Sequence, residues 1–89
     1  SQHCAEILKA VAHPVRLRIV ALLCQGEQHV SGICEHLGLP QAIVSQQLRI
    51  LRMKSLVQVM RSEGYAYYSL REPRLTDLVR CVEGCPVPR

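Results

Sequence analysis

The stretch SGICEHLGLPQAIVSQQLRILRMK (residues 31–54) decides the fold that we expect for this chain. Its first part predicts a short helix over residues 31–37, with Ser31 as the residue that caps its N-terminus. Gly38 ends this helix, and a second helix follows from about residue 41 to residue 54. A short helix, a tight turn that contains glycine and a second helix together form a helix-turn-helix.

The helical assignment depends on the spacing of apolar residues. In the first part of the segment, Ile33 and Leu37 lie four positions apart, so they share one face of a helix. In the second part, Val44, Leu48 and Leu51 recur at intervals of four and three, which again marks a single helical face. Each helix therefore has one face to bury, and the two faces can share a core.

The residues that follow predict a β-hairpin. Residues 56–61 alternate in character and contain β-branched valines, as a half-buried strand does. Residues 62–64 (SEG) fit a turn, and residues 65–70 (YAYYSL) fit a returning strand. The fold class that we expect is mainly α with a β-hairpin wing at about residues 56–70, which is a winged helix-turn-helix.

Further helices are expected on both sides of this unit. Residues 2–12 and 14–25 show helical spacing and are separated by a break before Pro14, a residue suited to the first turn of a helix. A final helix is expected at about residues 73–84. The whole chain, residues 1–89, is then one domain of four helices, a hairpin and a closing helix.

Composition favours a small domain that dimerises and binds an anionic partner. The chain has 89 residues, of which 48% are hydrophobic, but no Phe and no Trp, so its core must be aliphatic and small. Small cores are commonly completed by a second copy of the chain. The net charge of +4 favours an anionic partner. No stretch approaches the roughly 18 apolar residues of a membrane span, and nothing resembles a signal peptide, so we expect a cytoplasmic protein with reduced thiols.

The outer face of the second helix of the pair carries side chains that read DNA bases. Gln and Arg bond adenine and guanine edges in pairs, Ser bonds either, and an alanine methyl fits a thymine methyl. A recognition helix inserts its N-terminal residues into the major groove. The residues expected to contact bases are Gln41, Ala42, Ser45, Gln46 and Arg49. Arg52, and Arg61 on the hairpin, are expected to contact phosphates.

Two of the five cysteines and all four histidines show no pattern that indicates a site. Cys4 and Cys24 lie on apolar helix faces, so we expect them to be small buried residues. His13 is expected at a helix boundary, because Pro14 follows it. The other histidines are expected to be exposed: His3, His29 and His36.

Three segments together resemble the ArsR/SmtB family of bacterial winged-helix repressors. They are LKAVAHPVRLRIVALL (8–23), LGLPQAIVSQQLRILRMKSLV (37–57) and YAYYSL (65–70). The resemblance implies a homodimer formed by the helices at about 2–12 and 73–85, binding to double-stranded operator DNA, and release when an inducer binds. The chain departs from the family pattern at Pro40, where a serine is frequent, and at Ser55, where a glycine is usual.

The family's familiar metal sites are absent from this sequence. The region HVSGI (29–33) lacks the Cys-x-Cys of the arsenic- and cadmium-sensing branch. The last helix, RLTDLVRCVEG (74–84), has Asp77 but no histidine of the zinc-sensing branch, and the predicted recognition helix has no cysteine. We therefore expect no resident metal or other cofactor.

The sulfur- and redox-sensing members are the group that the cysteines resemble most. The resemblance implies a thiol switch between Cys34 and Cys85, with Cys81 as the alternate partner of Cys34. Its inducer would be a persulfide, a polysulfide or an oxidant. The competing interpretation is that Cys81 and Cys85 bind As(III) or a similar thiophilic ion, since soft thiolates select soft ions.

Functions of other classes are less well supported by the sequence. The chain has no glycine-rich phosphate loop and no second domain to form a cleft, so we expect that it is not an enzyme. A dimerising scaffold that does not bind DNA stays open, because the same fold could serve that role.

Overall fold

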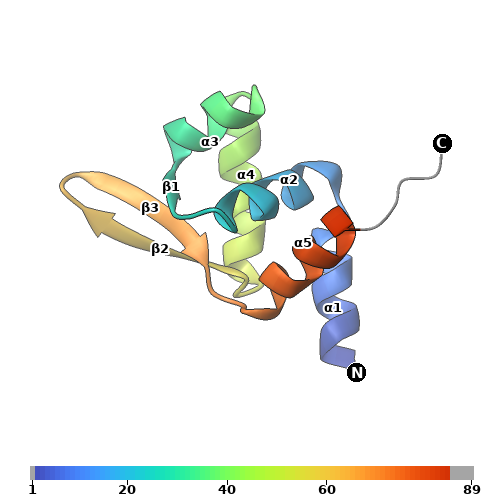
Figure 1. Ribbon diagram of the computed structural model, residues 1–89. Helices are drawn as coiled ribbons and strands as arrows, with labels where there is room; N and C mark the ends of the chain where they lie inside the picture. Colours follow the sequence, from blue (N-terminus) through green and yellow to red (C-terminus); the bar gives the residue numbers. More distant parts are fainter. Residues whose placement is uncertain (1, 85–89) are drawn as a thin grey trace.

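The computed structural model describes the backbone of residues 2–84 and the side chains of residues 4–80. Its helices and strands follow one another in the order expected for a winged helix-turn-helix, with one additional short strand (Figure 1). They are α1 (Gln2–Val11), α2 (Pro14–Leu23), β1 (Gln28–His29), α3 (Val30–Leu37), α4 (Gln41–Met53), β2 (Val57–Ser62), β3 (Tyr65–Leu70) and α5 (Arg74–Gly84). The predicted fold class is thus confirmed.

Histidines start two of the helices. The ring nitrogen Nδ1 of His13 accepts hydrogen bonds from the backbone N–H groups of Val15 and Arg16, at 3.2 and 3.4 Å, and so caps α2 as the boundary prediction implied. His29 caps α3 in the same way, through a 2.9 Å bond from the N–H of Gly32. The prediction that Ser31 caps this helix was wrong, because α3 begins one residue earlier and Ser31 lies inside it.

The wing is a three-stranded antiparallel sheet in the order β1-β3-β2. Strands β2 and β3 pair from Val57 opposite Leu70 to Ser62 opposite Tyr65. The two residues between the strands have positive φ, 50° at Glu63 and 83° at Gly64, which is the geometry of a tight type I′ hairpin turn. Strand β1 was not predicted, because two residues are too short to show alternation.

The backbone after α4 explains one departure from the family pattern. Ser55 has φ of 59°, a left-handed conformation that glycine adopts without strain. A serine adopts it at a cost of roughly 1–2 kcal/mol. The turn geometry that a glycine would provide is therefore kept by Ser55.

The core lies between the inner face of α4 and the helices around it. α2 is central, since it packs against α1, α3, α4, α5 and strand β3. Most of the apolar residues that defined the helical faces in the sequence are buried. The buried apolar set is Ile7, Ala10, Val11, Ile19, Val20, Leu22, Leu23, Ile33, Val44, Leu48, Leu51, Leu56, Val57, Leu75 and Val79.

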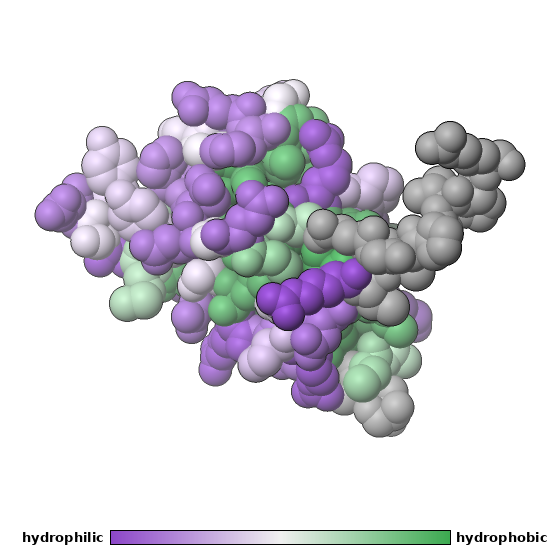
Figure 2. Space-filling view, viewed as in Figure 1, coloured by the Kyte–Doolittle hydropathy of each residue, from purple (hydrophilic) through white to green (hydrophobic). Residues whose placement is uncertain are grey.

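Helix α1 departs from its predicted pattern. Leu8 is 51% exposed, and Cys4 is exposed, so the prediction that Cys4 is buried was wrong. Figure 2 shows apolar surface over α1, at the lower right of the view. α1 and α5 lie beside one another in Figure 1 and line a common apolar groove. Its apolar lining includes Ile7 and Leu8 of α1 and Leu78 of α5. Among the described residues, no helix has the length and apolarity needed to cross a membrane.

Candidate DNA-binding surface

Helix α4 has one buried face and one exposed polar face. Val44, Leu48 and Leu51 are at most 1% exposed and hold the helix on the core. The predicted base-contacting residues lie on the remaining surface of α4, where Ser45 is half-buried and the others are exposed: Gln41, Ala42, Gln46 and Arg49. Arg52 is exposed in the last turn of α4. Arg61 is exposed on β2 of the wing, a separate element. The contacts of these residues with DNA stay predictions.

The N-terminal end of α4 leaves backbone donors available. Its N-cap is Pro40, which makes no side-chain capping bond. The N–H groups of Ile43 and Val44 bond to the Pro40 carbonyl, both at 3.2 Å. The first amides of a helix have no acceptor within the helix, and this end of the helix dipole is positive. An anionic phosphate at this end would therefore be stabilised.

The turn between α3 and α4 is held by two features. Gly38 ends α3 with φ of 65°, which a residue with a side chain adopts only with strain. Arg18 of α2 donates a 2.8 Å hydrogen bond from its guanidinium to the carbonyl of Leu37, one of the last carbonyls of α3. Nothing in the sequence pattern assigned Arg18 this role. This bond ties the C-terminal end of α3 to α2.

His29 joins the helix-turn-helix to the wing. Its ring stacks on Tyr65, with ring centroids 5.8 Å apart and an interplanar angle of 28°, and it packs at a tilt against Tyr67 at 5.9 Å. The side chain is half-buried, so the prediction that His29 is exposed was wrong. His36 is exposed, as expected, and its Nδ1 lies 2.7 Å from the carbonyl of Gly32.

Substituting His29 should separate its two roles. We expect His29→Ala to lower the free energy of unfolding by about 1–2 kcal/mol, since both the cap of α3 and the ring contacts are lost. His29→Asn supplies a side-chain oxygen as acceptor in place of the ring nitrogen Nδ1 and should recover about half of this loss. Urea unfolding followed by circular dichroism measures both variants. Equal stabilities of His29→Asn and His29→Ala would show that the cap contributes nothing.

One exposed apolar residue on α4 was missed by the sequence interpretation. Ile43 is 39% exposed and lies next to Ala42 in the first turn of the helix. Apolar side chains at this end of a recognition helix can contact thymine methyl groups. The spacing of Val44, Leu48 and Leu51 leaves Ile43 off the buried face, and this is the signal that could have identified it.

Cys34 is the one member of the predicted thiol switch whose side chain is described. It is half-buried in α3 and packs against the core. Its carbonyl accepts bonds from the N–H groups of Gly38 and Leu39, at 2.8 and 3.2 Å, so the residue lies where α3 turns toward α4. Cys85 and the side chain of Cys81 lie outside the described residues. The structure therefore does not test either predicted partner of Cys34.

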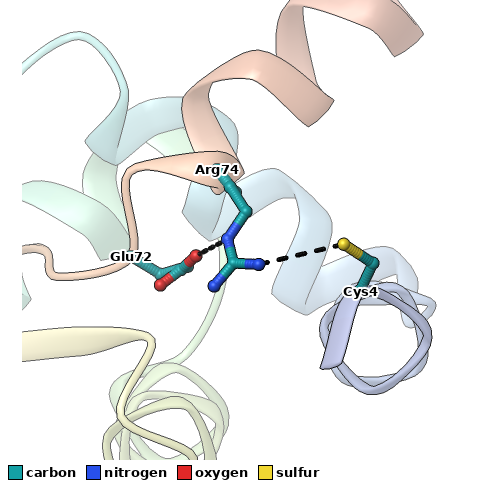
Figure 3. A network of polar contacts seen from close by, with 3 residues as sticks. All are labelled: Cys4, Glu72 and Arg74. Atoms are coloured by element: carbon teal, nitrogen blue, oxygen red, sulfur yellow. Dashed lines mark hydrogen bonds and ion pairs between the residues drawn. The ribbon is translucent and has the colours of Figure 1, made fainter. Parts of the chain in front are cut away.

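Other cysteines occupy different surroundings. Cys24 follows α2 as its C-terminal cap and is half-buried against the core. Cys4 lies 3.9 Å from a guanidinium nitrogen of Arg74, whose Nε donates to Glu72 (Figure 3). The bond to Glu72 raises the pKa of Arg74, so this guanidinium stays charged. Between residues 4 and 80, no three His, Cys, Asp or Glu side chains gather as a metal site would require. The alternative thiolate site, Cys81 with Cys85, falls beyond that range.

Known proteins resemble this chain over the helix-turn-helix, the segment that contains α4. The family model described as "Bacterial regulatory protein, arsR family" matches residues 13–59, which include the helix-turn-helix. The biofilm growth-associated repressor of Xylella fastidiosa is 36% identical over 78 residues. These residues are 88% of this chain and 68% of the relative.

Solved structures are similar over nearly the whole chain. The repressor BigR from Xylella fastidiosa has a TM-score of 0.88 and 33% identity, covering 97% of this chain and 90% of BigR. Reduced HlyU from Vibrio cholerae has a TM-score of 0.86 and 26% identity, covering 96% and 92%. The homodimeric winged helix-turn-helix DNA-binding domain of Mb0332 from Mycobacterium bovis has a TM-score of 0.79 and 30% identity, covering 92% and 76%.

Proposed function

Because this chain belongs to the arsR family of bacterial regulatory proteins, we propose that it is a repressor that binds operator DNA as a homodimer. We propose further that modification of a cysteine thiol makes the homodimer release the DNA. The polar outer face of α4 carries the DNA-binding part of the proposal. Its Gln, Ser and Arg side chains are of the types that bond base edges, and they lie near the N-terminal end of the helix.

Homodimerisation is supported by the apolar surface of the terminal helices. Leu8 is 51% exposed on α1, beside the groove that α1 shares with α5. Exposed apolar surface of this kind commonly marks a protein interface. The similar domain of Mb0332 is homodimeric. Two copies would present two α4 helices to successive major grooves of an operator with two half-sites.

Cys34 is proposed as the thiol that first reacts with the inducer. It lies on α3, at the turn into α4, and it is half-buried, so part of its surface is open to a small reagent. A persulfide R–S–S–H would transfer its outer sulfur to the Cys34 thiolate, forming Cys34–S–S–H and releasing R–S⁻. Additional atoms in a packed site force neighbouring groups to move. α3 packs against α4, so this movement would change how α4 is held.

A second cysteine would complete the switch. Its thiolate would attack the Cys34 sulfur, form a disulfide and release HS⁻. We propose Cys85 as this residue, with Cys81 as the alternate. α3 and α5 both pack on α2, so a link between them changes how α3 is held against α2. One neighbour in structure is described as the reduced form of HlyU, so redox state is a variable of that protein.

The test is a DNA-binding assay on single-cysteine variants. An operator duplex is selected from a random-sequence pool with the reduced wild-type protein, and fluorescence anisotropy then compares it with a shuffled duplex at one stated salt concentration. Treatment with glutathione persulfide should weaken operator binding by the wild type about 10–100-fold, a range typical of coupling between two sites. Cys34→Ser should retain its affinity after treatment.

Cys24→Ser is the matched control, since Cys24 is also half-buried against the core. This variant should lose affinity on treatment as the wild type does. If Cys34→Ser also loses affinity, or if Cys24→Ser is protected, the switch does not begin at Cys34. Peptide mass spectrometry of the treated wild type then identifies which cysteine carries the added sulfur.

A further inference from the structure

Gln47 is a polar residue on the buried face of α4. It is 8% exposed and lies on the inner face of α4, among Val44, Leu48 and Leu51. Among the described residues, Gln47 is the one polar side chain that is buried. A buried amide without a hydrogen-bond partner is costly, and an aliphatic residue would fill such a position without that cost. Its presence at this position therefore requires a partner.

The partner is Arg16 of α2. Its Nε donates a 3.1 Å hydrogen bond to Oε1 of Gln47. One terminal nitrogen of the same guanidinium donates a 2.9 Å bond to the carbonyl of Ala10, in the last turn of α1. The last carbonyls of a helix have no N–H partner within the helix, so the bond from Arg16 satisfies one of them. One planar group thus joins three helices: α1, α2 and α4.

This link restrains α4 in a way that aliphatic packing does not. Apolar contacts are non-directional, so a helix held only by leucine and valine is less strictly fixed in its rotation about its axis. A hydrogen bond from a planar guanidinium is directional and charge-assisted, and it weakens steeply when its angle changes. The bond to Gln47 therefore restrains α4 from rotating about its axis relative to the C-terminal end of α1.

We propose that Arg16 and Gln47 are positioning residues for operator recognition. They orient the exposed face of α4 against α1, one of the two helices through which the proposed homodimer forms, and so match the two recognition helices to the half-site spacing. This inference rests on the proposed function. Gln47 is buried, and the guanidinium of Arg16 bonds Gln47 and the Ala10 carbonyl, so their effect should fall on sequence-selective binding and not on the general attraction to phosphates.

Gln47→Met tests the link, since methionine is of similar shape and cannot accept a strong hydrogen bond. We expect about tenfold weaker binding to the selected operator and unchanged binding to the shuffled duplex. The dependence of affinity on half-site spacing should become flatter than that of the wild type. The melting temperature should fall by no more than about 10 °C, because Arg16 loses its acceptor at Nε but is only half-buried, and the buried amide of Gln47 is replaced by an apolar group.

Two further variants keep the proposal open to failure if Gln47→Met does not fold. Gln47→Glu keeps the acceptor for Arg16 and should bind the operator within about threefold of the wild type. Arg16→Lys keeps the charge but loses the planar paired donors, and it should bind the operator about tenfold more weakly. Gln25→Met, at an exposed position after α2, is the matched control.

Three results would overturn the inference while leaving the proposed function intact. They are unchanged operator binding by Gln47→Met and Arg16→Lys, equal losses on both duplexes, and a loss that the fall in melting temperature fully explains. If the wild type itself shows no preference for any selected duplex, the proposed function fails. The two failures are thus distinguished by the wild-type control.

Discussion

A variant carrying both Gln46→Ala and Arg49→Ala should lose about 100-fold or more of its affinity for the selected operator. Both side chains are exposed on the outer face of α4. Each well-placed pair of hydrogen bonds to a base edge contributes about 1–3 kcal/mol of discrimination. The homodimer presents each residue twice, so the losses accumulate over two half-sites. The folded state should be unaffected, because neither residue takes part in the core.

Fluorescence anisotropy with the selected and the shuffled duplex measures this loss. Binding to the shuffled duplex should weaken much less, since of the two side chains removed only Arg49 carries a charge that attracts phosphates. Gln25→Ala with Arg71→Ala is the matched control, because it removes the same side-chain types from exposed positions outside α4. Comparable losses in the control would mean that charge, and not base contact, accounts for the effect of the α4 variant.

Leu48→Ala should have the largest effect on stability. Leu48 is 1% exposed on α4 and is part of the apolar core. Truncation of a buried leucine costs about 2–5 kcal/mol, through lost burial and the cavity that is left. In a domain of this size, each kcal/mol lowers the melting temperature by roughly 4–8 °C. The melting temperature should therefore fall by about 10 °C or more.

Thermal unfolding followed by circular dichroism measures this change in the absence of DNA. Met53→Ala is the control, since Met53 lies on the same helix but is 78% exposed. It should shift the melting temperature by no more than a few degrees, as surface substitutions do. If Leu48→Ala and Met53→Ala proved equally stable, the burial of the inner face of α4 would be wrong.

Much of the fold was predictable because it depends on local patterns. The apolar spacing of Val44, Leu48 and Leu51 predicted which face of α4 is buried, and the hairpin followed from alternation around a Glu-Gly turn. Helix ends were predicted to within two residues, with the end of α2 at Leu23 as the largest error. These features depend on residues close together in the sequence, so the sequence contains the information needed to find them.

Features that join distant segments were not predictable in this way. Strand β1 is a strand only because β3 lies beside it, since its two residues carry no pattern of their own. Cys4 was expected in the core from its spacing on α1, but this part of the helix faces outward, next to Arg74. A helical pattern shows that residues share a face. It does not show what that face meets.

The sequence by itself determined the order of the helices and of the two hairpin strands, the buried face of α4 and the chemistry of its outer face, because periodicity and side-chain type act locally. The tertiary structure alone decided the partners of single polar groups. Gln47 bonds Arg16, 31 positions away, and His29 contacts the tyrosines of the wing. Such contacts depend on distances and directions between whole helices and strands. These are set by packing of the complete core, which no local pattern records.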